Sequence, residues 1–309
     1  MQEFLVKEES TGEFGKTPSE RGVDELLKNG VIILDKWQGP TSRDVVNVVK
    51  KLLDLKQAGH AGTLDPNVSG VLPITLENAC KVIPALQGLD KEYVGVMRLH
   101  KEVDDKVLKT AMTRFVGEII QKPPVKSAVA RRERKRRIYF MEILDRKEKD
   151  VCVHVRCQAG TYIRKLFDDI GKQIGGAHMK ELRRIAAGPF IEKDAHTIQE
   201  LQDAYNKWKE SGSDEIRKIV LPVESAIPHV RKIFIKDSAI TSVTNGSPVF
   251  TGGISKLERG IEKGELVGIM TLKGELVALA RSNMSTDEML SKKGIAAKTD
   301  RVVITKTLQ

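Results

Sequence analysis

Hydrophobic and polar positions recur along this chain with two different periods, and each period predicts a different kind of element. A short apolar run at residues 31–34, followed by Gly39 and Pro40, predicts a buried strand and then a turn. Thr41 and Asp44 have the spacing of a capping box, which places a helix start directly after that turn. The apolar residues that follow recur on one face of a helix: Val45, Val48, Val49 and Leu52.

Residues 91–99 alternate with the two-residue period that is typical of a strand. One face carries Tyr93, Gly95, Met97 and Leu99, and the other carries Val94 and Val96. Because both faces are apolar, we expect this strand to lie inside a sheet. Residues 151–157 alternate in the same way and lead into a predicted helix with Thr161 as its cap. The apolar stripe of that helix comprises Ile163, Leu166, Phe167, Ile170 and Ile174.

The pattern changes after His229 to short alternating runs separated by glycines. The segments KGELVGIM and KGELVALA predict two strands of a hairpin joined at Lys273 and Gly274. We therefore expect residues 230–303 to form a small all-β domain, a compact barrel. The SGSD segment at 211–214 predicts a break before this domain. Residues 1–28 lack a sustained apolar period, and we expect them to form an arm that packs on the barrel.

The net charge narrows the class of partner. The 309 residues include 52 Lys and Arg against 42 Asp and Glu, a formal net charge of +10. This excess favours a polyanion, with nucleic acid before an anionic membrane surface. Three cysteines without a CxxC pair argue against a disulfide framework and a four-cysteine zinc site. With no membrane-length apolar run and no secretory signal, we expect an intracellular, cytoplasmic protein in a reducing compartment.

The segment GHAGTLDPNVSGVLP, residues 59–73, carries the strongest chemical signal. Its glycines and prolines predict a shaped loop over most of its length. Asp65, held next to Pro66, is either a cap for a turn or helix or a functional carboxylate. His60 alone would be a structural hydrogen-bonding residue. Taken by itself, the segment indicates only a functional loop.

Three further features are also ambiguous in isolation. Arg164 could form an exposed i,i+4 pair with Asp168, and Tyr93 could be ordinary core packing on its strand. The run RRERKRR at 131–137 could be a solvated face. Its place between PPVKSAV and the strand-like residues 138–144 instead favours a basic ribbon or loop that projects toward phosphate.

The order of the motifs resembles one family. GHAGTLDPNVSGVLP, then KEYVGVMRLH, then PPVKSAV with RRIY, then GTYIRKLFDDIG resemble the TruB/dyskerin family of pseudouridine synthases. DKWQGPTS at 35–42 is similar to the family's lysine–proline–glycine–threonine–serine segment. The segments from KDSAITSVTNGSPVFTGGI to DRVVI resemble a PUA domain, an RNA-binding module. The resemblance extends from about residue 31 to residue 303.

The resemblance implies a reaction and its catalytic residues. The C–N glycosidic bond of a uridine breaks and the base rejoins the sugar through carbon, with no cofactor and no metal. Asp65 matches the family's catalytic aspartate; whether it attacks the sugar, attacks the base or removes a sugar proton stays open. Arg164 matches the arginine that pairs with this aspartate. Tyr93 matches the aromatic residue that stacks on the target base.

The resemblance also implies residues that bind substrate or RNA. His60 matches an RNA-contacting or loop-ordering residue, Leu182 the apolar lining of the uracil pocket, and Lys36 a basic residue near the active-site loop. Basic positions expected to contact RNA are Lys126, Arg131, Arg132 and Arg134. Two departures from the family pattern affect local RNA contacts: Ala130 replaces the usual lysine, and Trp37 replaces the usual proline.

An α+β fold follows from the resemblance. It comprises a catalytic domain, with a mixed, largely antiparallel sheet flanked by helices, and a small all-β PUA barrel. We expect an N-terminal arm at 1–28, the catalytic domain at 29–228, the PUA domain at 229–303 and a tail at 304–309.

The short segment after the tyrosine strand, with its LH-x-x-V motif, and the lack of a long lysine-rich tail are similar to the archaeal-type catalytic subunit of the H/ACA ribonucleoprotein. The implied partners are H/ACA guide RNA, substrate ribosomal RNA or tRNA, small accessory proteins and a kink-turn-binding ribosomal-type protein. No membrane is implied. A stand-alone tRNA T-arm pseudouridine synthase and a non-catalytic RNA-binding assembly scaffold stay open as alternatives.

Overall fold

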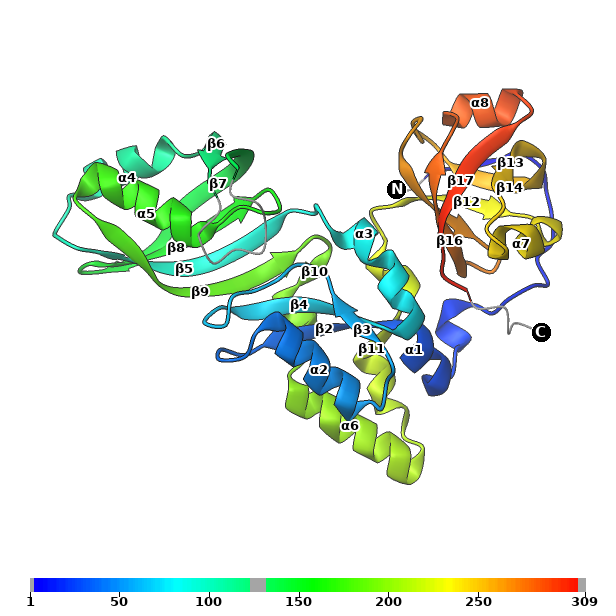
Figure 1. Cartoon of the computed structure of the whole chain (residues 1–309), viewed down its shortest axis with the longest axis horizontal. Coiled ribbons are helices and arrows are strands. Elements are labelled where there is room, and N and C mark those ends of the chain that lie inside the picture. The colour runs from blue at the N-terminus through cyan, green and yellow to red at the C-terminus, as the bar shows by residue number, and fades with distance from the viewer. Residues whose placement is uncertain (1–2, 123–131, 305–309) are drawn as a thin grey trace.

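A computed structural model of the chain describes residues 3–122 and 132–304. Its strands form two separate sheets, one of ten strands and one of seven. Figure 1 shows them as an elongated body at one side and a smaller rounded body at the other. No helix in the described ranges is long and apolar enough to cross a membrane.

The larger sheet is mixed and largely antiparallel, as expected. Its longest path runs in the order β11-β2-β4-β9-β5-β8-β7-β6, with β10 on β9 and β3 on β4. Among the strand pairs described in this sheet, only β4 and β9 run parallel, and Leu34 of β2 forms one isolated parallel bridge with His196. The strands are β2 (Gly30–Lys36), β3 (Ala58–His60), β4 (Ser69–Leu76), β5 (Lys91–Leu99), β6 (Gly117–Gln121), β7 (Arg134–Lys147), β8 (Asp150–Cys157), β9 (Ala177–Ala187), β10 (Phe190–Ile191) and β11 (Val220–Pro222).

Helices flank this sheet: α1 (Val23–Asn29), α2 (Ser42–Leu52), α3 (Ile83–Leu86), α4 (Asp105–Thr113), α5 (Ile163–Ile174) and α6 (Ile198–Ser211). The capping box at Thr41 and Asp44 is confirmed at the start of α2. The predicted apolar face of α2 is wrong at one position. Val48 is 41% exposed, and Val46 is buried in its place beside Val45 and Val49.

The predictions for the central strands are confirmed. β5 lies between β8 and β9, and the alternate residues of β8 from Val151 to Cys157 are buried. The whole apolar stripe of α5 is also buried. Thr161 is not the cap of that helix, because Tyr162 occupies the cap position without a capping side chain. The Thr161 hydroxyl instead donates to the Gln158 carbonyl, which tightens the turn before the helix.

The loop that contains Asp65 is shorter than its glycines and prolines suggested. β4 begins at Ser69 and continues through Pro73, which pairs with Ile33 of β2. The irregular part therefore spans residues 61–68 only. Gly70, with φ +105°, lets β4 approach the Arg184 backbone, because a Cβ there would lie 2.1 Å from the Arg184 carbonyl oxygen.

The smaller sheet follows the order β1-β14-β12-β15-β16-β17-β13 and packs over its own hydrophobic cluster. The predicted hairpin is β15–β16, with its turn at Lys273 and Gly274. Two short helices accompany the strands of this domain. The elements are β12 (Arg231–Ile235), α7 (Asp237–Thr244), β13 (Val249–Phe250), β14 (Ile254–Glu258), β15 (Leu266–Met270), β16 (Leu276–Ser282), α8 (Thr286–Ser291) and β17 (Ile295–Val302).

The N-terminal segment spans both bodies. β1 (Phe4–Val6) pairs with β14 of the smaller sheet, whereas α1 packs beside the larger one. Between them, the buried Arg21 guanidinium forms ion pairs with Glu224 at 2.8 Å and Glu275 at 2.9 Å. This three-residue cluster, called here the Arg21 clamp, joins the arm, the end of the larger domain and the smaller domain.

Short 3₁₀ turns complete the chain: η1 (Pro18–Glu20), η2 (Glu77–Val82), η3 (Glu192–Asp194), η4 (Asp214–Lys218), η5 (Val223–Ala226) and η6 (Thr251–Gly253). The predicted break at SGSD is confirmed. α6 ends at Ser211, and Gly212 with φ +72° forms its left-handed C-cap.

Candidate active site

The Asp65 loop, residues 61–68, is held from below by a lysine. Lys36, at the end of β2, has no exposed surface. Its ammonium donates to the Val68 carbonyl at 2.8 Å, the Trp37 carbonyl at 2.9 Å and the Pro66 carbonyl at 3.2 Å. Burial lowers the pKa of this lysine. Lys36 therefore positions the loop, and in this structure it presents no surface to RNA.

A second set of bonds ties the loop to the start of α2. The Ser42 hydroxyl donates to the Leu64 carbonyl at 3.1 Å and accepts from the Leu64 amide at 2.8 Å. The Gly39 amide donates to the Pro66 carbonyl at 2.9 Å. The turn after β2, the first turn of α2 and the Asp65 loop thus form one hydrogen-bonded unit.

The structure brings Asp65 and Arg164 together although 99 residues separate them. Arg164 lies in the first turn of α5, and its Nη2 donates to Asp65 Oδ2 at 2.7 Å. This partner is Asp65 and not Asp168, the alternative i,i+4 partner. Both side chains remain open to solvent, with 55% of Asp65 and 49% of Arg164 exposed. A ligand can therefore reach the carboxylate.

Tyr93 lies on β5 in the interior of the larger domain, with 9% of its surface exposed. Burial raises the pKa of its phenol, and the negative charge of Asp65 raises it further. The Arg184 guanidinium hydrogen-bonds the phenol and opposes this shift. The phenol therefore stays protonated at neutral pH, within electrostatic range of the carboxylate.

Two buried cations below the loop were not expected. Arg184 on β9 donates to the Val71 carbonyl at 2.8 Å and to the Gly62 carbonyl at 3.0 Å. Lys91, at the start of β5, donates to the Leu89 carbonyl at 2.6 Å. Burial lowers the pKa of both, and for Lys91 burial with the nearby Arg184 charge lowers it to about 8. Gly62 lies against both side chains, because a Cβ there would be 3.5 Å from Arg184 Nη1 and 3.5 Å from Lys91 Cε.

A signal for these two cations is present in the sequence. In β5, Lys91 has the same parity as Tyr93 and Met97, which places it on the buried face. In β9, Arg184 has the same parity as the buried Leu182 and Ala186. A charged residue at a position of the apolar face is predicted to be buried. Because burying a charge costs free energy, such a residue indicates a structural or functional role.

The other two expected pocket residues are mostly enclosed. His60 ends β3, and its Nδ1 is buried without a hydrogen-bond partner. Burial and the Arg184 charge lower the pKa of this histidine, so it is neutral at neutral pH. Leu182 is buried and packs over Gly95 of the neighbouring strand, where a Cβ would lie 2.7 Å from Leu182 Cδ1.

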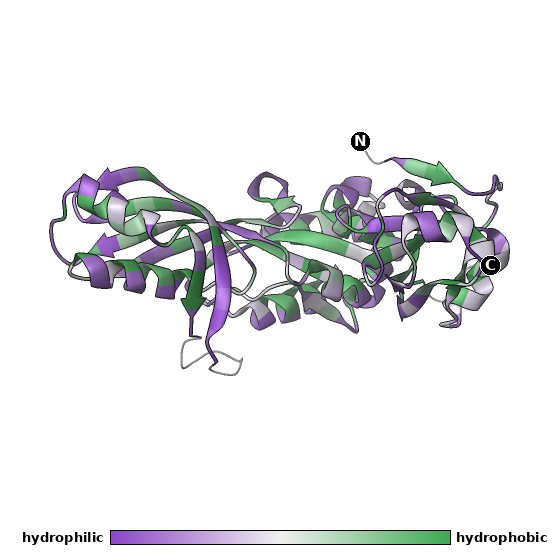
Figure 2. Cartoon of the chain, turned by 90° about the horizontal axis from the view of Figure 1, so that it is seen from above, coloured by the Kyte–Doolittle hydropathy of each residue, from purple (hydrophilic) through white to green (hydrophobic). Residues whose placement is uncertain are grey.

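The basic run starts β7, which pairs with β6 as a two-stranded ribbon. Figure 2 shows the hydrophilic start of β7 extending out from the body of the domain. Arg132 is exposed and Arg134 is half-buried at the first position of the strand. Lys126, Ala130 and Arg131 lie outside the described residues. The Arg136 guanidinium reaches the turn before α5, where a Cβ on Gly160 would lie 3.1 Å from it.

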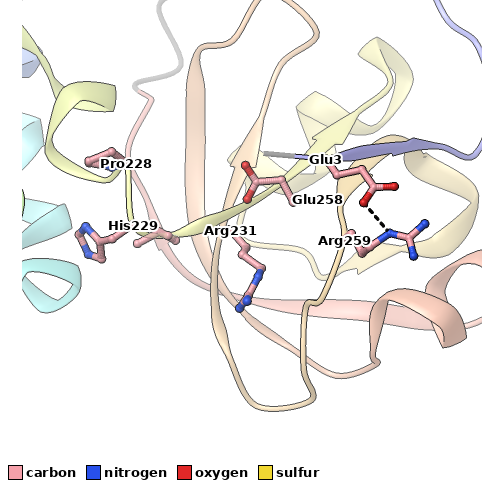
Figure 3. Close-up of a pocket in the computed structure, with 7 residues that line it drawn as sticks. Glu3, Pro228, His229, Arg231, Glu258 and Arg259 are labelled. Carbon is pink, nitrogen blue, oxygen red and sulfur yellow. Dashed lines mark ion pairs between the residues drawn. The ribbon is translucent and has the colours of Figure 1, made fainter. Parts of the chain in front are cut away.

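A separate hollow of about 450 Å³ lies in the smaller domain. Figure 3 shows it between the start of β12, the end of β14 and the N-terminal strand. Its charged groups are paired: Arg259 with Glu3 at 3.0 Å, and Arg231 with Glu265. None of the expected site residues lines it. Among residues 3–122 and 132–304, no cluster of three His, Cys, Asp or Glu side chains could hold a metal ion.

The Asp65 site can therefore act on a polar ligand that enters from solvent. It presents an ionisable carboxylate fixed by a guanidinium, a protonated phenol and a neutral imidazole above three buried cations. Such a site can hold an anionic or electron-rich group and supports addition or proton transfer.

Comparison with family models covers nearly the whole chain. Residues 50–163 match the TruB family pseudouridylate synthase N-terminal domain, and residues 164–228 match the tRNA pseudouridylate synthase B C-terminal domain. Residues 231–303 match the PUA domain, and residues 1–46 match the DKCLD (NUC011) domain.

Curated relatives from archaea are similar over almost their full length. A protein of Methanocaldococcus jannaschii named "Probable tRNA pseudouridine synthase B" is 47% identical over 97% of this chain and 91% of its own. A protein of the same name from Pyrococcus furiosus is 48% identical over 97% of this chain and 91% of its own.

Solved structures share the fold of the whole chain. A chain of the "Crystal Structure of a Cbf5-Nop10-Gar1 Complex" superposes with a TM-score of 0.93 and 47% identity, covering 100% of this chain and 96% of that one. A chain of the "Structure of H/ACA RNP bound to a substrate RNA containing 2'-deoxyuridine" gives a TM-score of 0.92 and 45% identity over the same shares.

Proposed function

The chain belongs to the TruB family of pseudouridine synthases, and on that premise we propose that it isomerises uridine in ribosomal RNA as the catalytic subunit of an H/ACA-type ribonucleoprotein. The observation that carries the proposal is the Asp65–Arg164 pair, open to solvent beside the buried Tyr93. The similarity to a chain from an H/ACA particle with bound substrate RNA supports this setting for the reaction.

The isomerisation conserves every atom of the nucleotide. The bond from sugar C1′ to base N1 breaks, a bond from C1′ to base C5 forms, C5 loses a proton and N1 gains one. Asp65 acts as nucleophile at the sugar, as nucleophile at the base, or as the base that removes a sugar proton; each role needs the carboxylate in its ionised form. Arg164 balances its charge and orients it.

The other residues bind and align the target uridine. Tyr93 stacks on the base, which helps to offset the loss of stacking when the nucleotide leaves the RNA. Its protonated phenol is a candidate for the late proton transfer. His60 orders the loop or contacts RNA, and Leu182 lines the base pocket. Arg132, just before β7, and Arg134, at its start, contact RNA phosphates. Lys126 and Arg131, outside the described residues, are also expected to contact RNA.

The domain arrangement supports a guided particle. We place the N-terminal arm at 1–28, the catalytic domain at 29–228, the PUA domain at 229–303 and a tail at 304–309; the division into two sheets supports this assignment. The partners are a guide RNA, small accessory proteins such as the Nop10 and Gar1 of the similar complex, and a kink-turn-binding ribosomal-type protein. The archaeal relatives favour a cytoplasmic particle.

Replacing Asp65 with Asn tests the catalytic assignment. We expect Asp65→Asn to abolish pseudouridine formation while RNA affinity stays near that of the original chain, because the amide keeps the shape and loses the charge. Asp168→Asn, one helical turn after Arg164 in α5, serves as the matched control and should retain activity. Product is measured by chemical mapping of pseudouridine in a guide–substrate RNA mixture. Wild-type rates from Asp65→Asn would instead favour the non-catalytic scaffold.

A tRNA uridine is the second candidate substrate, because the curated archaeal relatives are named "Probable tRNA pseudouridine synthase B". Sequencing the small RNAs that copurify with the chain from its host separates the two. Enrichment of hairpins that end in ACA supports the guided particle. Enrichment of tRNA without such hairpins supports a stand-alone enzyme.

A further inference from the structure

The two tryptophans of the chain lie in contrasting surroundings. Trp208 on α6 packs against the Tyr205 ring at 5.6 Å between centroids and lies beneath the Lys209 ammonium. Trp37 is 38% exposed, and within residues 3–122 and 132–304 no ring or cation contact involves its indole. The indole of Trp37 is therefore accessible to a ligand, whereas the Trp208 ring is covered by Lys209.

Trp37 sits on a rigid support shared with the catalytic loop. Its carbonyl accepts a hydrogen bond from the same Lys36 ammonium that holds the Pro66 and Val68 carbonyls. Two residues further on, the Gly39 amide donates to Pro66 at 2.9 Å. The turn that bears the indole therefore cannot move independently of the loop that bears Asp65. A contact made by this side chain is fixed in relation to the reacting nucleotide.

An exposed cation lies six residues further along the chain. Arg43, in the first turn of α2, is exposed, and no ion pair or side-chain hydrogen bond of this residue occurs in the described ranges. The neighbouring Asp44 carboxylate is occupied by the capping box with Thr41. An exposed indole and an unpaired guanidinium six residues apart along the chain are the two groups that single-stranded nucleic acid recognition uses, with the ring for a base and the cation for a phosphate.

We propose that Trp37 stacks on an unpaired nucleobase adjacent to the target uridine, and that Arg43 contacts the phosphate of the same strand. The inference rests on the proposed function, since it takes RNA as the ligand. It adds a second base-binding position outside the Tyr93 pocket. Proline, the usual residue of the family at this position, has no aromatic face, so it cannot make the same π-stacking contact.

Tryptophan fluorescence tests the contact directly. In a Trp208→Phe background, Trp37 is the sole source of indole emission. The probe is a fluorescein-labelled single-stranded oligoribonucleotide containing one uridine, and its anisotropy reports binding independently. We expect indole emission to fall in proportion to the bound fraction, because a stacked base quenches the indole. Full binding by anisotropy with unchanged indole emission overturns the proposal.

Substitutions separate stacking from simple packing. We expect Trp37→Ala and Trp37→Leu to weaken RNA binding by about 5- to 150-fold, the range measured for loss of one stacked base. Trp37→Phe should retain most of the affinity because it keeps an aromatic face. Val48→Ala, at an exposed apolar position of α2, is the matched control and should bind as the original chain does. Equal affinity for Trp37→Ala and the control overturns the stacking contact.

Activity distinguishes this inference from the proposed function. Trp37→Ala should raise KM and leave kcat near its original value, because the indole touches a neighbouring base and not the reacting one. Arg43→Ala should reduce the slope of log affinity against log salt by about one. An active enzyme insensitive to Trp37→Ala refutes only the stacking contact. A chain with no isomerase activity on any RNA refutes the proposed function, whatever the indole reports.

Discussion

Two clusters of buried charge in the described residues are built on opposite principles. In the Arg21 clamp, one guanidinium meets two carboxylates, Glu224 and Glu275, at 2.8 and 2.9 Å. Below the Asp65 loop, three cations are buried: Lys36, Lys91 and Arg184. All three donate to backbone carbonyls, and Arg184 also bonds the Tyr93 phenol. In the described part of the larger sheet and its helices, no Asp or Glu is buried to the same degree.

The difference separates a structural joint from a functional site. In the Arg21 clamp each carboxylate faces the guanidinium, and such a buried ion pair resists the removal of either partner. Buried cations without a buried anion destabilise the fold, and they produce a positive potential at the surface above them. The surface above them is the Asp65 loop, where an RNA substrate brings negative charge. The predictions below test whether the two clusters behave in these opposite ways.

The largest effect on stability is expected at the clamp. Arg21→Met leaves two carboxylates of low exposure without a partner, so the free energy of unfolding should fall by about 3–5 kcal/mol. Chemical denaturation measures this change. As control, Lys207→Met removes the exposed Lys207–Glu215 pair and should change nothing measurable. Equal stability of the two variants would mean that the clamp does not join the domains.

Lys91→Met should act in the opposite direction on stability. The folded-state pKa of Lys91 is lowered from 10.5 to about 8, so below pH 8 the buried charge costs about 3 kcal/mol. Methionine removes this cost, and we expect a more stable but less active protein at pH 7.

The pH dependence gives the sign of the Lys91 effect. Between pH 8 and 10.5 the folded state releases the proton before the unfolded state does, so the cost shrinks as the pH rises. The difference in unfolding free energy between Lys91→Met and the original chain should be largest below pH 8 and vanish above 10.5. A difference that does not change with pH contradicts a buried charge at this position.

The smallest of the three effects is expected at Lys36 and concerns the reaction. Lys36→Met removes the hydrogen bonds to the Pro66 and Val68 carbonyls that hold the Asp65 loop in position. Because the carboxylate is then misplaced, kcat should fall about a hundredfold. RNA affinity should be unchanged, because the ammonium has no exposed surface. Loss of RNA affinity together with an unchanged kcat would show that Lys36 contacts RNA.

Local pattern predicted much of the framework. The capping box at Thr41, the buried alternation of β5 and β8, the stripe of α5 and the β15–β16 hairpin all depend on residues close in sequence. The errors at Val48 and Thr161 also have local causes. A helical face several residues wide does not tell Val46 from Val48, and several polar residues before a helix can compete for its cap.

The chain sequence by itself therefore determined its elements, its basic character and, through the order of its motifs, its family. Only the tertiary structure placed Asp65 against Arg164. It also brought the buried cations Lys91 of β5 and Arg184 of β9 together beneath the Asp65 loop. The reason is that periodicity reports which face of one element is buried, whereas the neighbours across that face come from distant segments. Whether a buried charge finds a carboxylate or only carbonyls depends on how those segments pack.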